Sequence, residues 1–149
     1  MNIFDSNCEA LVNPVNCVGV MGKGLALQFK KRFPRTCDIY IRAAKEGRVV
    51  PGYVFITPVI EEDRIPGDGG LPRYIIHFPT KQHWAEKSRI EFIRDGLESL
   101  RKTIKLYNIE SIAIPAIGCG LGGLNWSEVR REIQHRLNGI PGVTIIEPG

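Results

Sequence analysis

Two glycine-rich segments, one near each end of the chain, supply residues suited to binding phosphate. The first runs from Gly19 to Ala26 and has three glycines within six residues, and the second runs from Pro115 to Leu124. Glycine lets the main chain approach an anion closely and adopt positive φ at little cost. Each segment follows an apolar run and is expected to lead into a helix, whose free N–H groups and dipole favour phosphate. Two such loops facing each other predict a site for a nucleotide diphosphate.

The first segment has the form Gly-x-x-Gly-x-Gly, which is neither the dinucleotide-binding fingerprint nor the P-loop. Lys23 within it either adds charge to the site or is a surface lysine. Asn13 and Asn16 come at the end of the preceding apolar run, where a ligand crevice opens in α/β sheets. Each asparagine either hydrogen-bonds a sugar hydroxyl or a water molecule, or caps a turn.

The elements that must position these residues alternate between strand and helix. The apolar patterns predict strands over residues 11–15, 53–60, 73–78, 112–115 and 143–146, and helices over residues 25–33, 36–45, 88–104 and 127–137. Ser88 and Glu91 have the spacing of a capping box at the start of the third helix. Residues 61–71 are acidic and glycine-rich and predict an exposed hairpin loop. This order predicts an α/β sheet covered by helices on both faces.

The composition is that of one globular domain over residues 1–149, with 43% hydrophobic and 24% charged residues. No apolar stretch approaches the roughly 20 residues that cross a membrane. The cysteines have neither Cys-x-x-Cys spacing nor a histidine partner, which indicates reduced thiols and a cytoplasmic location. The three histidines His77, His83 and His135 lack the spacing of metal ligands, so we expect no metal and no cofactor.

The net charge of +4 permits nucleic acid as a partner without requiring it. Two groups of basic residues stand out, one over residues 30–35 and one over residues 81–89. Either group alone is also typical of a solvated helix face.

Three stretches carry a resemblance to a known family. They are Leu-Val-Asn-Pro-Val-Asn-Cys-Val-Gly-Val-Met-Gly-Lys-Gly-Leu-Ala-Leu-Gln-Phe (11–29), Phe-Pro-Thr-Lys-Gln-His-Trp (78–84) and Ile-Pro-Ala-Ile-Gly-Cys-Gly-Leu (114–121). The first and third resemble the two ligand loops of macrodomains. The likeness runs over nearly the whole chain and is nearest to the branch of terminal ADP-ribose protein glycohydrolase and the DarG-type DNA ADP-ribosyl glycohydrolase antitoxins. The second stretch is most similar to the DarG-type subgroup.

The resemblance implies a three-layer α/β/α macrodomain with a mixed, mostly parallel central sheet that lacks the usual first strand. The implied ligand is ADP-ribose and the implied reaction is its hydrolytic release, with Lys81 and Asn16 as the catalytic residues at the distal ribose. The other implied ADP-ribose contacts come from the N-terminus, both glycine loops and the residue before Lys81. They are Asn2, Ile3, Asn13, Gly19, Val20, Met21, Gly22, Gly24, Leu25, Ala26, Thr80, Pro115, Ile117, Gly118, Cys119, Gly120, Leu121, Gly122 and Gly123.

Lys81 has two chemical roles open to it. A neutral amine can attack the anomeric carbon or bond to the opened sugar as a Schiff base, whereas an ammonium can stabilise a leaving thymine oxygen or nitrogen. The neutral form requires burial or a cationic neighbour to lower the pKa of Lys81 from roughly 10.4. A bound diphosphate has the opposite effect on this pKa.

One departure concerns the target. The protein-directed relative has an aspartate after Gly-Cys-Gly-Leu, and this chain has Gly122 there, as the DNA-directed subgroup does. We therefore predict release of ADP-ribose from a thymidine base on single-stranded DNA, with His83, Trp84 and Lys87 as candidate DNA contacts. Core packing is the alternative for Trp84. The resemblance further implies a cognate DNA ADP-ribosyltransferase toxin as a partner, and we expect a monomer without membrane association.

Two other functions stay open. The first is a non-catalytic reader that binds ADP-ribose. The second is a hydrolase or phosphatase acting on protein-linked ADP-ribose or on ADP-ribose 1″-phosphate.

Overall fold

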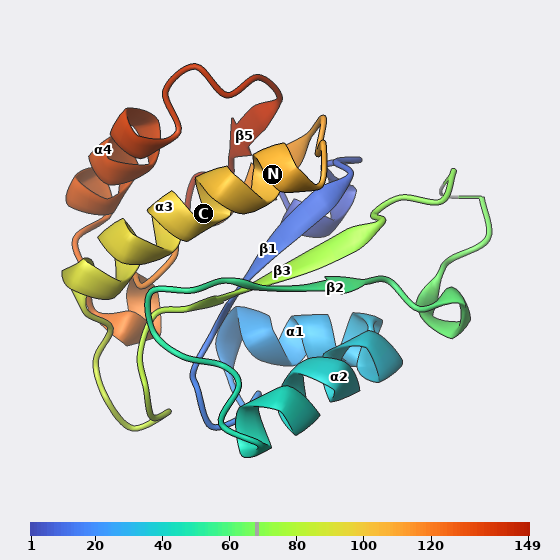
Figure 1. Ribbon diagram of the computed structural model, residues 1–149, viewed down its shortest axis with the longest axis horizontal. Coiled ribbons are helices and arrows are strands. Elements are labelled where there is room, and N and C mark those ends of the chain that lie inside the picture. Colours follow the sequence, from blue (N-terminus) through green and yellow to red (C-terminus); the bar gives the residue numbers. More distant parts are fainter. Residues whose placement is uncertain (68) are drawn as a thin grey trace.

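The computed structural model describes residues 1–67 and 69–149, so residue 68 of the loop predicted over residues 61–71 lies outside the described residues. Five strands form one sheet between two pairs of helices, in the order β2-β3-β1-β4-β5 (Figure 1). The strands are β1 (Ala10–Val15), β2 (Phe55–Pro58), β3 (Tyr74–Pro79), β4 (Ile112–Ile114) and β5 (Val143–Ile145). All neighbours pair in parallel except β2, which is antiparallel to β3. The predicted three-layer, mostly parallel architecture is confirmed.

The central strand β1 is buried on both faces because helices cover the sheet above and below. Its residues pair with β3 on one side and β4 on the other, with Val12 opposite Ile76 and Ala10 opposite Ile112. Ahead of β1 lies a single turn of 3-10 helix, Ile3–Asp5, and within the described residues no strand precedes β1. The sheet therefore lacks the first strand, as the sequence predicts.

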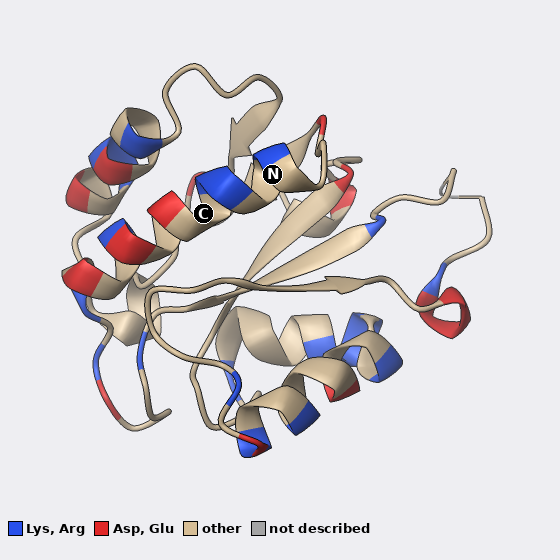
Figure 2. Cartoon of the chain, viewed as in Figure 1, with Lys and Arg blue, Asp and Glu red and all other residues tan. Residues whose placement is uncertain are grey.

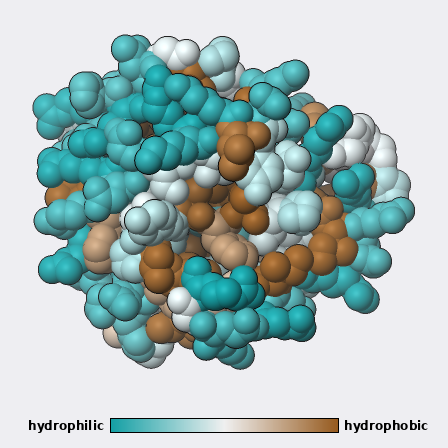
Figure 3. Space-filling view, viewed as in Figure 1, coloured by the Kyte–Doolittle hydropathy of each residue, from teal (hydrophilic) through white to brown (hydrophobic). Residues whose placement is uncertain are grey.

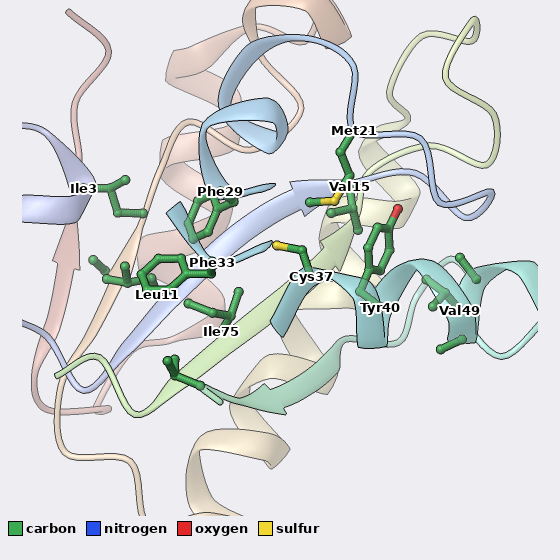
Figure 4. Packing of buried hydrophobic residues seen from close by; sticks show 14 of the residues in the cluster. Ile3, Leu11, Val15, Met21, Phe29, Phe33, Cys37, Tyr40, Val49 and Ile75 are labelled. Carbon is green, nitrogen blue, oxygen red and sulfur yellow. The ribbon is translucent and has the colours of Figure 1, made fainter. Parts of the chain in front are cut away.

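The helices α1 (Gly24–Arg32) and α2 (Pro34–Lys45) cover one face of the sheet (Figure 1). Figure 4 shows Phe29 and Phe33 lying against Leu11, with Tyr40 farther along α2. Pro34 ends α1 and also begins α2, two residues before the predicted start. Proline suits the first position of a helix because its fixed φ is helical and its missing N–H has no intrahelical partner there.

The start of α2 takes its cap from a distant part of the chain. Asp63, which ends the 3-10 turn Glu61–Asp63, accepts hydrogen bonds from the main-chain N–H of Arg35 and of Thr36, and from the Thr36 hydroxyl. A carboxylate at this position also interacts favourably with the helix dipole. The loop between β2 and β3 is thereby joined to the helix layer.

The opposite face is covered by α3 (Ile90–Leu106) and α4 (Trp126–Arg136). Ile93, Leu97 and Leu100 of α3 are fully buried together with Phe78 of β3. Arg94 of α3 pairs with Glu132 of α4, which joins the two helices at the surface. The predicted helix starts are two residues early at α3 and one residue late at α4.

Charge and apolar surface are distributed unevenly. Figure 2 shows Lys and Arg on α1 and α2 and in the loop that follows β3. Figure 3 shows apolar side chains gathered at the centre of this view, between the helix layers, where the edge strand β2 runs. Among the described residues, no helix is long and apolar enough to span a membrane.

Gly96 permits the close packing of α3 on the sheet. A Cβ at residue 96 would lie 2.4 Å from Cζ of Phe78. We expect Gly96→Ala to destabilise the fold by about 1–3 kcal/mol, since overpacking outweighs the roughly 1 kcal/mol gained in helix propensity. Urea denaturation measures this change, and Lys102→Ala on the exposed face of α3 is the control. A Gly96→Ala variant more stable than the wild type would contradict this packing.

Candidate functional site

Three loops meet at the carboxyl edge of the sheet because β1, β3 and β4 are parallel. We call residues 16–23 the first glycine loop, residues 80–89 the lysine loop and residues 115–125 the second glycine loop. They follow β1, β3 and β4 respectively and lie on the left side of the sheet in Figure 1. In open α/β sheets this edge is where ligands bind.

Main-chain contacts join the three loops. The N–H of Cys17 donates to the carbonyl of Gln82 at 2.9 Å, and the N–H of Ser88 donates to the carbonyl of Gly122 at 3.0 Å. A Cβ at Gly24 would lie 3.3 Å from Cδ1 of Leu121, so the two glycine segments also touch each other. The sequence prediction that the two glycine loops face each other is therefore confirmed.

Asn16 shapes the first glycine loop from within. Its Oδ1 accepts hydrogen bonds from the N–H groups of Val18, Gly19 and Val20, and its Nδ2 donates to the carbonyl of Val20 at 2.8 Å. Gly19 has a φ of +81°. The Asn16 side chain is 5% exposed and is engaged with its own loop, which corresponds to the turn-capping alternative. A contact between Asn16 and the distal ribose stays a prediction.

Tyr40 and Met21 connect the first glycine loop to the core. The Tyr40 hydroxyl donates to the main-chain carbonyl of Asn16 at 2.7 Å. Met21 is 3% exposed, and Figure 4 shows its side chain directed toward Val15 of β1. Because the Met21 side chain is part of the core, only its main chain is available to the ADP-ribose expected at this position.

The first glycine loop leads into a helix end without a side-chain cap. The N-cap residue of α1 is Lys23, whose side chain makes no capping hydrogen bond, and Gly22, Lys23 and Gly24 are exposed. The first turn of α1 has no acidic residue. This end of α1 fits the predicted anion site, since its main-chain N–H groups and dipole favour negative charge.

The second glycine loop does not lead into an uncapped helix, contrary to what the sequence predicts. It leads into a single 3-10 turn, Gly120–Gly122, and the next helix, α4, is capped by Asn125, whose side chain accepts from the N–H of Glu128 at 3.2 Å. The prediction that this loop ends at a free helix N-terminus is therefore wrong. The loop is instead closed on itself, with the N–H of Leu124 donating to the carbonyl of Gly118 at 3.0 Å.

Lys81 lies half-buried at the start of the lysine loop. Burial lowers the pKa of its ammonium group from the ordinary value, and the nearby charge of Lys87 lowers it further. Lys87 itself lies against the second glycine loop, because a Cβ at Gly123 would be 3.3 Å from its Cδ. Burial and a cationic neighbour, either of which favours the neutral amine, are therefore both present at Lys81.

Ser88 does not cap α3, so the predicted capping box is wrong. The N-cap residue is Arg89 and makes no side-chain cap. The Ser88 hydroxyl instead donates to Oγ1 of Thr80 at 3.1 Å, inside the lysine loop. Both residues are buried, at 6% and 3% exposed. A tertiary partner has replaced the local one that the pattern predicted.

A chain of buried polar side chains runs through the sheet beneath the site. Nδ2 of Asn13 lies 3.2 Å from Nδ1 of His77, and Nε2 of His77 lies 3.1 Å from Oγ1 of Thr57. All three residues are buried, so the Asn13 side chain is not available to a ligand at the surface. His77 is an interior residue, and burial lowers its pKa from 6.5 to about 3.

The cysteines near the site are not poised for nucleophilic chemistry. Burial, with a smaller contribution from Glu86, raises the pKa of Cys17 to about 11. Burial also raises the pKa of Cys119 in the second glycine loop. Both groups are thiols at neutral pH, and the thiolate is the nucleophilic form. Among the described residues, no cluster of histidine, cysteine or acidic side chains could hold a metal ion.

The aromatic residues near the site have different environments. Trp84 is 53% exposed, so the core-packing alternative for it is wrong, and its ring centroid lies 5.1 Å from that of His83. Trp126 is half-buried and its Nε1 donates to Glu147 at 2.8 Å, which is a structural role. Asn2 caps the 3-10 turn by accepting from the N–H of Phe4 at 3.0 Å.

The predicted ADP-ribose contacts divide by exposure. The exposed ones are Asn2, Val20, Gly22, Gly24, Gly120, Leu121 and Gly123; the half-buried ones are Gly19, Leu25, Ala26 and Cys119; the buried ones are Ile3, Asn13, Met21, Thr80, Pro115, Ile117, Gly118 and Gly122. A cavity of about 290 Å³ lined by Phe4, Arg32 and Arg64 lies at the opposite edge of the sheet and is separate from this surface.

The sequence and the fold of this chain are similar to those of known proteins. The Macro domain family profile matches residues 12–133. The chain belongs to the Macro domain family. The solved macrodomain of Mycobacterium tuberculosis DarG superimposes with a TM-score of 0.90 at 39% identity, covering 100% of this chain and 94% of that one. The macrodomain of Thermus aquaticus DarG gives a TM-score of 0.89 at 43% identity, covering 99% and 95%.

Curated relatives of this macrodomain include the DNA ADP-ribosyl glycohydrolases of Thermus aquaticus, 45% identical, and of Mycobacterium tuberculosis, 41% identical. Each alignment covers 97% of this chain, but only 38% and 39% of the respective relative. The chain therefore spans about two fifths of the length of these relatives. The resemblance to macrodomains inferred from the sequence is confirmed.

His77 makes the stability of the fold depend on pH. Its folded-state pKa of about 3 lies below the ordinary 6.5, so as pH falls below 6.5 the unfolded chain takes up a proton that the folded chain does not. We expect the free energy of unfolding to fall by about 1.4 kcal/mol for each pH unit below 6.5, and to be unaffected by His77 at higher pH.

Urea denaturation between about pH 7 and about pH 5 measures this slope. The slope should be smaller in His77→Gln, and His135→Gln, at an exposed position of α4, should keep the wild-type slope. The same slope in all three proteins would show that His77 does not control it.

Proposed function

We propose that this macrodomain hydrolyses the bond between ADP-ribose and a thymidine base on single-stranded DNA. Lys81 carries the proposal. It lies half-buried at the junction of the lysine loop with two glycine loops, and burial and Lys87 lower its pKa. An amine in this state can act as a nucleophile toward the distal ribose while the glycine loops hold the diphosphate.

The reaction then proceeds in two stages. Nζ of neutral Lys81 attacks C1″ of the distal ribose, the bond from C1″ to the base breaks, and the base leaves with the electron pair and takes up one proton from Nζ. The ring bond between C1″ and O4″ then breaks, O4″ takes up the second Nζ proton, and the opened sugar is held as a Schiff base on Nζ. Water adds to C1″, the bond from C1″ to Nζ breaks as the amine regains its protons, and O4″ closes the ring of the released ADP-ribose. The net change is the addition of one water molecule.

The choice of target rests on two observations, and a third supports the ligand. Residue 122 is a glycine, whereas the protein-directed glycohydrolase that this chain resembles has an aspartate at this position. Relatives at 41–45% identity are named DNA ADP-ribosyl glycohydrolases. A solved relative, Thermosipho africanus DarTG in complex with ADP-ribose, superimposes with a TM-score of 0.88 at 36% identity, covering 99% of this chain and 40% of that one.

The same relatives support a partner. A Thermosipho africanus relative, 36% identical over 136 residues, is named a DNA ADP-ribosyl transferase-DNA ADP-ribosyl glycohydrolase fusion protein. We propose that a DNA ADP-ribosyltransferase toxin supplies the modified DNA that this macrodomain restores. A monomeric state and a cytoplasmic location stay predictions.

Replacing Lys81 tests the proposed chemistry. The wild type and Lys81→Ala are each incubated with thymidine-linked ADP-ribosyl DNA, glutamate-linked ADP-ribosyl protein and ADP-ribose 1″-phosphate. We expect release from the DNA alone, on the order of 10³-fold slower in Lys81→Ala because the nucleophile is lost, with the affinity for free ADP-ribose nearly unchanged.

Borohydride added during turnover should trap the Schiff base on the wild type and not on Lys81→Ala. Lys105→Ala, at the far end of α3, is the control and should keep the wild-type rate. Undiminished release by Lys81→Ala would contradict the role of Lys81, and binding of ADP-ribose without any release would leave a reader. Absence of trapping with full turnover would favour an ammonium that stabilises the leaving base.

We propose that the ring of Trp84, which is 53% exposed, stacks on a base of the DNA strand. We expect Trp84→Ala to weaken binding of modified single-stranded DNA by about 5- to 100-fold, since a stacked base contributes about 1–3 kcal/mol. Free ADP-ribose should bind as before, and Tyr107→Ala, an exposed aromatic at the far end of α3, should change neither affinity. Binding should also weaken as salt rises, because Lys87 and Arg89 meet the backbone phosphates. Salt-independent binding would argue against a DNA target.

A further inference from the structure

One neighbouring residue, Ser88, leaves no space for a side chain at residue 122. A Cβ at residue 122 would lie 2.3 Å from Oγ of Ser88 and 3.0 Å from Cβ of Ser88, closer than real side chains approach. The next nearest atom, the main-chain nitrogen of Ser88, would be 4.0 Å away. Gly122 does not have a positive φ, so its own backbone accepts any residue. The obstacle to a side chain is therefore the side chain of Ser88.

Ser88 is held firmly in this position. Its hydroxyl donates to Oγ1 of Thr80 at 3.1 Å, and its N–H donates to the carbonyl of Gly122 at 3.0 Å. The next residue, Arg89, donates its N–H to the carbonyl of Thr80 at 3.1 Å. Because Ser88 is 6% exposed, turning its hydroxyl away would leave the buried Oγ1 of Thr80 without this partner.

We propose that Ser88 is a specificity-determining residue, which keeps position 122 free of a side chain and so commits the site to substrates that Lys81 releases without a carboxylate partner. This inference rests on the proposed function, because it assigns the reaction to Lys81.

A carboxylate at residue 122 would change the chemistry of its surroundings. The adjoining Gly123 lies beside Lys87, with 3.9 Å between its Cβ position and Nζ of Lys87, and Lys87 is close enough to Lys81 to affect its charge. A negative group here favours the ammonium form of Lys81 and offers a general base for water. An ester of ADP-ribose leaves as a stable carboxylate and is helped by such a base, whereas a nucleobase leaving group needs a proton. A carboxylate at residue 122 would therefore favour release of the ester over release of the nucleobase.

A double-mutant cycle tests this role of Ser88. Gly122→Asp alone should lower the Tm by several degrees and weaken ADP-ribose binding more than tenfold. Adding Ser88→Ala should restore both in part, because its Cβ would still lie 3.0 Å away, and adding Ser88→Gly should restore them further, since only the nitrogen at 4.0 Å remains. Gly22→Ala is the control for the Tm alone, because a Cβ there meets only Val20 at 4.0 Å and should leave the Tm unchanged. Its affinity for ADP-ribose is not compared, since Gly22 is itself an expected ADP-ribose contact.

The rates of ADP-ribose release from the protein substrate and from the DNA substrate then measure the specificity. In Ser88→Gly/Gly122→Asp, the ratio of release from glutamate-linked protein to release from thymidine-linked DNA should rise at least tenfold over the wild type. Two results would overturn the inference: a Gly122→Asp single variant with the wild-type Tm and affinity, or a double variant that recovers binding with an unchanged ratio. If the wild type releases nothing from DNA, the proposed function fails, while the Tm and binding cycle still decides whether Ser88 excludes a side chain.

Discussion

Three parallel strands end at one edge of the sheet, and the loops that follow them are joined by main-chain hydrogen bonds. The loop after β1 lies between the other two, since β1 is paired with β3 on one side and β4 on the other. The carbonyl of Val15, the last residue of β1, accepts a hydrogen bond from the N–H of Thr80 at 3.0 Å. In the loop that follows, the N–H of Cys17 donates to the carbonyl of Gln82. Main-chain hydrogen bonds therefore couple the three loops. A substitution that displaces one loop is expected to displace the other two as well.

The two glycine loops do not offer the same kind of anion site. The first ends at the N-terminus of α1, which has no side-chain cap and no acidic residue in its first turn. The second ends in a 3-10 turn, and the N-terminus of α4 beyond it is already capped by Asn125. The dipole of α1 therefore favours the phosphate nearest the first loop. At the second loop the positive charge comes from a side chain, Lys87, rather than from a helix end.

Sequence patterns predicted what depends on neighbours in the chain. Apolar runs and glycine spacing located the strands and both loops, since burial and positive φ leave a local signature. Ser88 shows where this fails, because the spacing to Glu91 matched a capping box and the hydroxyl is instead bonded to Thr80, across the lysine loop. For Asn16 and Asn13 the sequence left a ligand contact and a turn cap open, and the structure shows the Asn16 side chain bonded within its loop and the Asn13 side chain bonded to His77 in the sheet. Such choices depend on tertiary partners, which no local pattern contains.

The state of Lys81 follows from opposing effects on its pKa. Burial and Lys87 favour the neutral amine, whereas a diphosphate in the glycine loops would favour the ammonium. Lys87 lies against Gly123 of the second glycine loop, and in the proposed complex its charge would pair with the diphosphate. Such a pairing would offset part of the negative charge that Lys81 would otherwise experience. Residue 122 is a glycine and carries no carboxylate, and a Cβ there would lie 2.3 Å from Oγ of Ser88. Burial of Lys81 favours the neutral amine, which is the form that the proposed attack on a sugar carbon requires.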